Sequence, residues 1–229
     1  MKHILNLLIV LPIALGVQFT TNPLNKDRSL KTIKQADKSE VTVYYDSMCG
    51  DSLNFIKYSF RPYFNSKELY TRYKVTLVPG SLMTSDVSNS FICKHGYNEC
   101  VGNIYHICAK SLYSNDLYNQ YVICFFDFMR AYSYNVEETS NYCTGSLGLN
   151  FTDLKKCSDS DQGLTLASNL VKMKQAYNFS FGHSPLAIIE NNLSSNEDEI
   201  FSNLVGYLCK INGNKENISN CTYFRSNKN

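Results

Sequence analysis

The stretch Cys49-Gly50-Asp51-Ser52 has the residue types and the spacing of a thiol–disulfide exchange site. The β-branched and aromatic run Val41–Tyr45 predicts a strand just before it. Leu53, Ile56 and Phe60 follow at the spacing of a core-facing helix. A cysteine at a helix start meets unpaired N–H groups and the positive end of the helix dipole, which stabilise a thiolate. The thiolate is the attacking group in exchange, so we expect Cys49 to be the nucleophile.

Ser52 stands where a dithiol site would carry its second cysteine. In a dithiol reductase the second thiol attacks the mixed disulfide and releases the substrate, and serine cannot do this. What remains is monothiol chemistry, in which Cys49 forms the mixed disulfide and glutathione or another small thiol resolves it. The carboxylate of Asp51 opposes a second negative charge on the nearby sulfur.

The first 16 residues have the pattern of a secretory signal peptide. Lys2 precedes the apolar run Ile4–Val17, and Ala14-Leu15-Gly16 supplies small residues for cleavage after Gly16. The alternative, a membrane anchor, is weaker because a spanning helix needs about 20 apolar residues. No later stretch is long and apolar enough, so we expect no membrane span. The sequence predicts export through an oxidising lumen, with secretion as the expected destination and lysosomes as the alternative.

Five N-x-S/T sequons agree with that route and predict a glycoprotein. They begin at Asn150, Asn178, Asn192, Asn217 and Asn220.

The net charge of the chain argues against partners that are bound through strong electrostatic attraction. Its 22 Lys and Arg residues nearly balance 20 Asp and Glu residues. A nearly neutral protein gives no basis for binding nucleic acid or an anionic membrane. The length favours one domain with insertions over two cores.

The order of predicted elements indicates an α/β fold. Tyr73–Val78 predicts a second strand, and two strands that flank a helix form a βαβ unit with a parallel pair. The patterns downstream predict a helical block, a proline-led strand and a final amphipathic helix. This order is a thioredoxin-like βαβ core with a helical insertion. The downstream segments are helical patterns at 100–134 and 164–177, the strand Pro185–Ile189 and the helix Glu197–Ile211.

Pro185 is the expected partner of Cys49 in this plan. In thioredoxin-like folds a cis proline lies against the reactive cysteine, and cis bonds are nearly confined to proline. We therefore expect a cis Ser184–Pro185 bond and take Cys49, Ser52 and Pro185 as the catalytic residues. The alternative is an ordinary proline at a strand entrance.

The stretch from Cys93 to Cys108 resembles the signature of the gamma-interferon-inducible lysosomal thiol reductase (GILT) family, C-Q-H-G-x-x-E-C-x-x-N-x-x-x-x-C. Lys94 replaces the glutamine, and the other fixed positions match. The resemblance implies a thioredoxin-like fold, passage through the secretory route, and exchange on disulfide-containing protein substrates, often in acidic lysosomes, without a cofactor beyond a small thiol. The matching residues are Cys93, His95, Gly96, Glu99, Cys100, Asn103 and Cys108.

A zinc site is the alternative for this stretch, with Cys93, His95, Cys100 and Cys108 as ligands. In an oxidising compartment such cysteines form disulfides more often, so we expect no metal and structural roles for His95 and His106.

Cysteine parity divides the nine cysteines into two groups. Setting Cys49 aside leaves an even set that can close four disulfides, although spacing does not settle the connectivity. Loop length alone favours Cys209–Cys221 and Cys143–Cys157. The alternative for an odd cysteine is a disulfide that links two chains. The even set is Cys93, Cys100, Cys108, Cys124, Cys143, Cys157, Cys209 and Cys221.

Two classes of function follow. The first is a secreted or lysosomal protein that performs monothiol exchange through Cys49. The second is a catalytically silent glycoprotein that kept the scaffold and binds another protein or a cell surface, because fold does not fix function. The expected segments are a signal peptide (1–16), a flexible leader (17–40), the domain (41–221) with its insertion at about 93–177, and a tail (222–229).

Overall fold

The structure, a computed structural model, describes residues 40–80, 83–84, 91–176, 185–189, 192–193, 196–211 and 221. The predicted signal peptide, most of the predicted leader and the predicted tail lie outside these residues, so their limits stay predictions.

A mixed sheet with the strand order β2-β1-β5-β6 lies at the centre of the described domain. β1 (Glu40–Tyr45) pairs in parallel with β2 (Lys74–Pro79), with Val43 opposite Leu77. β5 (Leu186–Ile189) pairs antiparallel with the other edge of β1, and β6 (Asn192–Leu193) continues from β5. The predicted βαβ unit is therefore present, and β1, which leads to Cys49, has a strand on each side.

The helix that follows Cys49 is continuous from Gly50 to Asn65 but changes its winding. α1 (Gly50–Phe55) runs into the π-helix η1 (Ile56–Phe60), and α2 (Arg61–Asn65) completes it. Pro62 explains the change, because it donates no N–H and its ring clashes with the carbonyl one turn earlier. The proline thus alters the helix without ending it.

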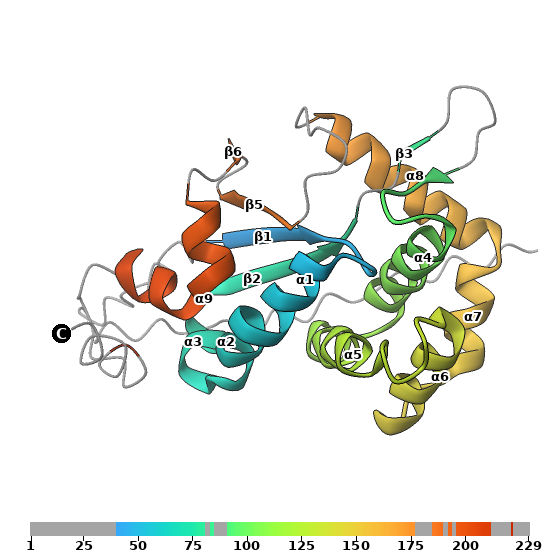
Figure 1. Ribbon diagram of the computed structural model, residues 1–229, viewed down its shortest axis with the longest axis horizontal. Helices are drawn as coiled ribbons and strands as arrows, with labels where there is room; N and C mark the ends of the chain where they lie inside the picture. Colours follow the sequence, from blue (N-terminus) through green and yellow to red (C-terminus); the bar gives the residue numbers. More distant parts are fainter. Residues whose placement is uncertain are drawn as a thin grey trace, which may run out of the picture. The chain divides into compact units, whose positions relative to one another are not determined.

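Helices and short strands between β2 and β5 form a block beside the end of β1 that leads to Cys49 (Figure 1). α4 is central to this block, because it packs against α5, α6, α7 and α8 as well as β2. The remaining elements are α3 (Lys67–Arg72), β3 (Met83–Thr84), β4 (Phe91–Ile92), α4 (Tyr97–Leu112), α5 (Asn115–Phe128), α6 (Val136–Ser146), α7 (Phe151–Ser158) and α8 (Asp161–Ala176).

The final helix, α9 (Glu197–Ile211), has the predicted bounds and packs on η1. It kinks at Asn203, whose backbone is non-helical. The Asn203 side chain accepts a hydrogen bond from the Gly206 N–H at 2.9 Å, so it caps the second half of the helix.

Both faces of the sheet are covered. Val43 and Leu77 belong to a core that includes Phe55 and Phe60, whereas Tyr44 belongs to a second cluster with residues of α8. This alternation follows from the period of two in a strand. Within the described residues, no helix combines the length and apolarity that a membrane crossing requires.

Candidate active site around Cys49

Cys49 lies between β1 and α1, as the residue that caps the helix start. Its N–H donates to the Asp46 carbonyl at 3.2 Å, and its own carbonyl accepts from the Leu53 N–H at 3.0 Å. Its side chain makes no capping hydrogen bond and belongs to none of the disulfides. The residue is only 4% exposed. These hydrogen bonds thus fix the backbone of Cys49, and little of the residue reaches solvent.

Ser52 lies on the first turn of α1 and is fully buried. Its hydroxyl oxygen accepts a hydrogen bond from the Asp46 N–H at 3.0 Å. The residue in the second-cysteine position therefore closes the loop between β1 and α1.

The turn before Cys49 is held by α4, which is distant in sequence. The Asn103 side-chain oxygen accepts from the Ser47 N–H at 2.9 Å, and the Ser47 hydroxyl donates to the Glu99 carbonyl at 3.2 Å. The Asn103 amide also donates to the buried Asp46 carboxylate at 3.3 Å. We call this arrangement of Asp46, Ser47, Glu99 and Asn103 the turn clamp. It uses two signature residues to position the segment that carries Cys49.

Glu99 has a completely buried carboxylate. One oxygen accepts from the His95 backbone N–H at 3.0 Å, and the other lies 2.5 Å from His95 Nδ1. Burial, with the nearby Asp46 carboxylate, raises the pKa of Glu99 above its ordinary value, and His95 opposes that rise. His95 thus acts on the turn clamp through Glu99, which is a structural role.

Two glycines meet geometric demands in this region. Gly96 precedes α4 with φ of 88°, a conformation that other residues rarely adopt. A Cβ atom on Gly102 would lie 2.3 Å from the Ser47 hydroxyl oxygen, so only glycine lets α4 approach the turn this closely.

A buried polar cluster supports the end of β1. The Tyr45 hydroxyl lies 2.7 Å from His106 Nδ1 and 3.0 Å from the Tyr118 hydroxyl. Burial lowers the pKa of His106 to about 3, so the ring stays neutral at physiological pH. His106 therefore has a structural role and links α4 to the strand that leads to Cys49.

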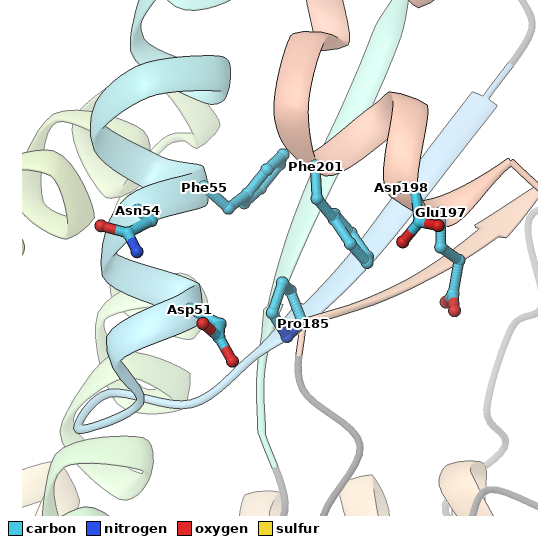
Figure 2. Close-up of a pocket in the computed structure, with 7 residues that line it drawn as sticks. All are labelled: Asp51, Asn54, Phe55, Pro185, Glu197, Asp198 and Phe201. Carbon is cyan, nitrogen blue, oxygen red and sulfur yellow. The ribbon is translucent and has the colours of Figure 1, made fainter.

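Pro185 is buried and borders a cavity of about 330 Å³ next to the start of α1. Figure 2 shows Asp51 directed toward Pro185, and Phe201 extending from α9 toward the same proline. The structure thus places Pro185 and the start of α1, which begins just after Cys49, at the same cavity. The predicted cis bond involves Ser184, which lies outside the described residues, so the cis geometry stays a prediction.

The eight other cysteines form four disulfides. Cys209–Cys221 agrees with the expectation from loop length, whereas the expected Cys143–Cys157 bond is wrong. That prediction used loop length alone. The packing of α4 against α7 and of α5 against α6 decides the pairing instead. The pairs are Cys93–Cys100, Cys108–Cys157, Cys124–Cys143 and Cys209–Cys221.

These disulfides remove the thiolates that the alternative zinc site would need, because Cys93, Cys100 and Cys108 are all oxidised. Among the residues that the structure covers, no group of three His, Cys, Asp or Glu side chains is placed to hold a metal ion.

One sequon has a described side chain. Asn150 is exposed at the start of α7, where its side-chain oxygen accepts from the Thr152 N–H at 2.9 Å. The amide nitrogen that would carry a glycan is not used by this bond. Asn178, Asn217 and Asn220 lie outside the described residues, and of Asn192 only the backbone is described.

The sequence did not indicate Asp46, Ser47 or Gly102 as site residues. The sequence did contain a clue for Asp46 and Ser47, because they are polar residues between a predicted strand and the expected nucleophile. Gly102 gave none, because its close contact with Ser47 exists only after α4 packs against the turn.

Comparison with known proteins points to one family. The profile described as gamma interferon inducible lysosomal thiol reductase (GILT) matches residues 40–147. GILT-like protein 1 of Drosophila melanogaster is 25% identical over 195 residues, which cover 79% of this chain and 78% of the relative. A gamma-interferon-inducible lysosomal thiol reductase-like protein of Anopheles gambiae is 43% identical over 75 residues, which cover 31% of this chain and 30% of the relative. These matches support membership of the GILT family.

The fold comparison agrees with this membership. The solved structure of the oxidoreductase DsbA from Xylella fastidiosa superimposes with a TM-score of 0.53 at 10% identity, covering 78% of this chain and 89% of the DsbA chain. At this identity the likeness concerns the fold alone, and it confirms the predicted thioredoxin-like class. GILT membership and this fold together support a thiol–disulfide oxidoreductase function.

Proposed function

We propose that this GILT-family protein performs thiol–disulfide exchange on protein substrates through the single nucleophile Cys49. The observation that carries the proposal is the position of Cys49 at the start of α1, outside all four disulfides and behind a turn held by α4. Ser52 stands where a dithiol site would carry its second cysteine, and its hydroxyl oxygen accepts a hydrogen bond from the Asp46 N–H. The site therefore keeps the attacking sulfur and lacks the internal release step.

The exchange has two steps. In the first, the Cys49 thiolate attacks one sulfur of a substrate disulfide, that S–S bond breaks, and the other substrate sulfur leaves as a thiolate. In the second, a small thiol such as glutathione attacks the mixed disulfide and releases Cys49. Each step breaks one disulfide and forms one, so the substrate sulfur is left in a disulfide with the small thiol. A second small thiol reduces that bond and forms the disulfide of the small thiol, so net reduction uses two small thiols.

The same proposal includes the secretory route. The oxidised cysteines, the apolar start of the chain and the sequons support passage through an oxidising lumen, with secretion or lysosomal delivery as the destination.

Insulin reduction, at acid and neutral pH and with or without glutathione, tests this function. We expect turnover only with glutathione, a trapped mixed disulfide at Cys49 without it, and neither in Cys49→Ser. Ser52→Cys should gain turnover that needs less glutathione, because the new thiol lies one turn from Cys49.

Two results would contradict the proposal. Turnover by the wild type without any small thiol would mean that another cysteine resolves the intermediate. If Ser52→Cys forms a disulfide with Cys49 yet gains no activity, the site is not built for exchange. The silent binding glycoprotein then becomes the better assignment.

A further inference from the structure

A cavity lies at the start of α1, the helix that begins just after the proposed nucleophile. Asp51 is two residues from Cys49 on the same helix start, and it lines the cavity together with the buried Pro185. A substrate disulfide that reaches Cys49 therefore brings its neighbouring residues to this cavity.

The cavity has acidic groups on two elements. Asp51 comes from α1, whereas Glu197 and Asp198 come from the first turn of α9. Glu197 accepts a hydrogen bond from the Ala187 N–H at 2.9 Å, which orients its carboxylate without neutralising it. No basic side chain is found among the described residues that line the cavity. An incoming side chain therefore meets negative charge.

Apart from Asn54, the rest of the described lining is apolar, and this is a separate observation. The rings of Phe55 and Phe201 meet edge to face with centroids 5.6 Å apart, and Pro185 lies below Phe201 in the view of Figure 2. Asn54 points to the other side of α1 in the same view. Aromatic walls next to carboxylates suit a side chain that has an apolar stem and a cationic end.

We propose that this cavity selects substrates in which an arginine or lysine lies next to the reactive cysteine. The stem of the basic side chain packs on Phe201 and Pro185, while its charged end meets Asp51, Glu197 and Asp198. Arginine fits best, because its planar guanidinium stacks on aromatic rings and pairs with more than one carboxylate. The inference rests on the proposed function, since Cys49 exchange makes the neighbouring cavity a specificity site.

Peptides that differ at one position test the selectivity. Each carries a cysteine activated as a 2-pyridyl disulfide and, next to it, Arg, Gln or Glu. The Cys49 thiolate attacks the peptide sulfur, the peptide–pyridyl S–S bond breaks, and 2-thiopyridone leaves with a proton from solvent. Its absorbance gives the rate. At low ionic strength we expect the Arg peptide to react about tenfold faster than the Glu peptide. Added salt should shrink this ratio, because it screens exposed charges.

The variant Asp51→Asn/Glu197→Gln/Asp198→Asn should bring the ratio close to one. A change in the intrinsic reactivity of Cys49 would affect all peptides alike and cancel in the ratio. Glu199→Gln is the matched control, because Glu199 is on the same helix turn but pairs with Lys210 at 2.8 Å and does not line the cavity. Circular dichroism verifies that each variant is folded.

A second measurement separates this inference from the proposed function. Fluorescence anisotropy follows binding of labelled peptides that carry alanine in place of cysteine. Equal rates and equal binding for Arg and Glu peptides overturn the inference and leave exchange intact, as does a ratio that survives in the triple variant. Selective binding of the Arg peptide without any thiopyridone release supports the cavity and overturns exchange at Cys49.

Discussion

At the scale of single residues, Ser52 and Glu99 act on the nucleophile by shaping the segment before it. Ser52 accepts from the Asp46 N–H inside the loop, and Glu99 belongs to the turn clamp outside it. The Ser52 hydroxyl and the Glu99 carboxylate are both buried, and Glu99 contacts Ser47 through its backbone carbonyl. Away from water, an unmade hydrogen bond or an isolated charge is costly. Substitutions at these two positions therefore have measurable effects on stability.

Ser52→Ala should lower the free energy of unfolding by about 1–3 kcal/mol, because it leaves the buried Asp46 N–H without its acceptor. Urea denaturation measures the change. Ser202→Ala is the matched control, since the Ser202 hydroxyl donates to the Asp198 carbonyl on an exposed turn and its loss should be near neutral. Equal effects in both variants would show that the Ser52 hydrogen bond does not hold the loop.

Glu99→Gln should change how stability depends on pH. The folded-state pKa of Glu99 is raised above the ordinary value of 4.5 by burial and the Asp46 carboxylate. A raised pKa means that the contribution to stability is full below the unfolded value and is lost as pH rises through the folded value. The stability of Glu99→Gln relative to wild type should therefore increase from pH 4 to pH 7.

Urea titrations at several pH values measure this difference. Glu137→Gln serves as the control, because Glu137 pairs with Lys155 on the surface. A difference between wild type and Glu99→Gln that stays constant with pH would contradict the assignment of an unfavourable buried charge to Glu99.

At the scale of elements, disulfides fix the positions of the helices between β2 and β5 relative to one another. Cys108–Cys157 ties α4 to α7, and Cys124–Cys143 ties α5 to α6. Since α4 also supplies the turn clamp, the first bond supports the position of Cys49 indirectly. The bond Cys209–Cys221 closes a much shorter loop after α9, with a sequence separation of 12.

Removing these disulfides should lower the free energy of unfolding by different amounts. Loop-closure entropy predicts about 4 kcal/mol for Cys108→Ser/Cys157→Ser, whose separation is 49 residues. It predicts about 3 kcal/mol for Cys209→Ser/Cys221→Ser. Denaturation of both double variants without reductant measures the order. A larger loss for the shorter loop would mean that native packing, and not chain entropy, dominates.

At the scale of the whole molecule, the described domain separates one thiol from eight oxidised cysteines. Iodoacetamide without reductant should label Cys49 alone, slowly in the native protein because the residue is 4% exposed, and much faster in urea. Peptide mapping reads the site of the label. Label at Cys93 or Cys100 would show that their disulfide is labile and would contradict the covalent framework.

The sequence predicted the parts of this molecule that depend on local patterns. β1, the helix after Cys49, β5 and α9 each have their own periodicity, so their positions could be inferred. The π-helical turn, the turn clamp and three of the four cysteine pairings could not, because they arise when distant segments meet. Asn103 and Ser47, for example, are 56 positions apart, and nothing local in either segment specifies their contact. The signature marked Asn103 as important but gave no physical role for it.

The turn clamp also has a consequence for biosynthesis. Cys49 is made well before Glu99 and Asn103, so on the proposed secretory route the thiol would enter an oxidising lumen before the residues that will fix its position have left the ribosome. Until α4 has docked, Cys49 is an accessible nucleophile that can react with each cysteine that emerges after it, beginning with Cys93. Correct oxidation of the chain therefore depends on how quickly α4 docks against the turn after β1. The order of synthesis sets a kinetic hazard that the finished structure no longer shows.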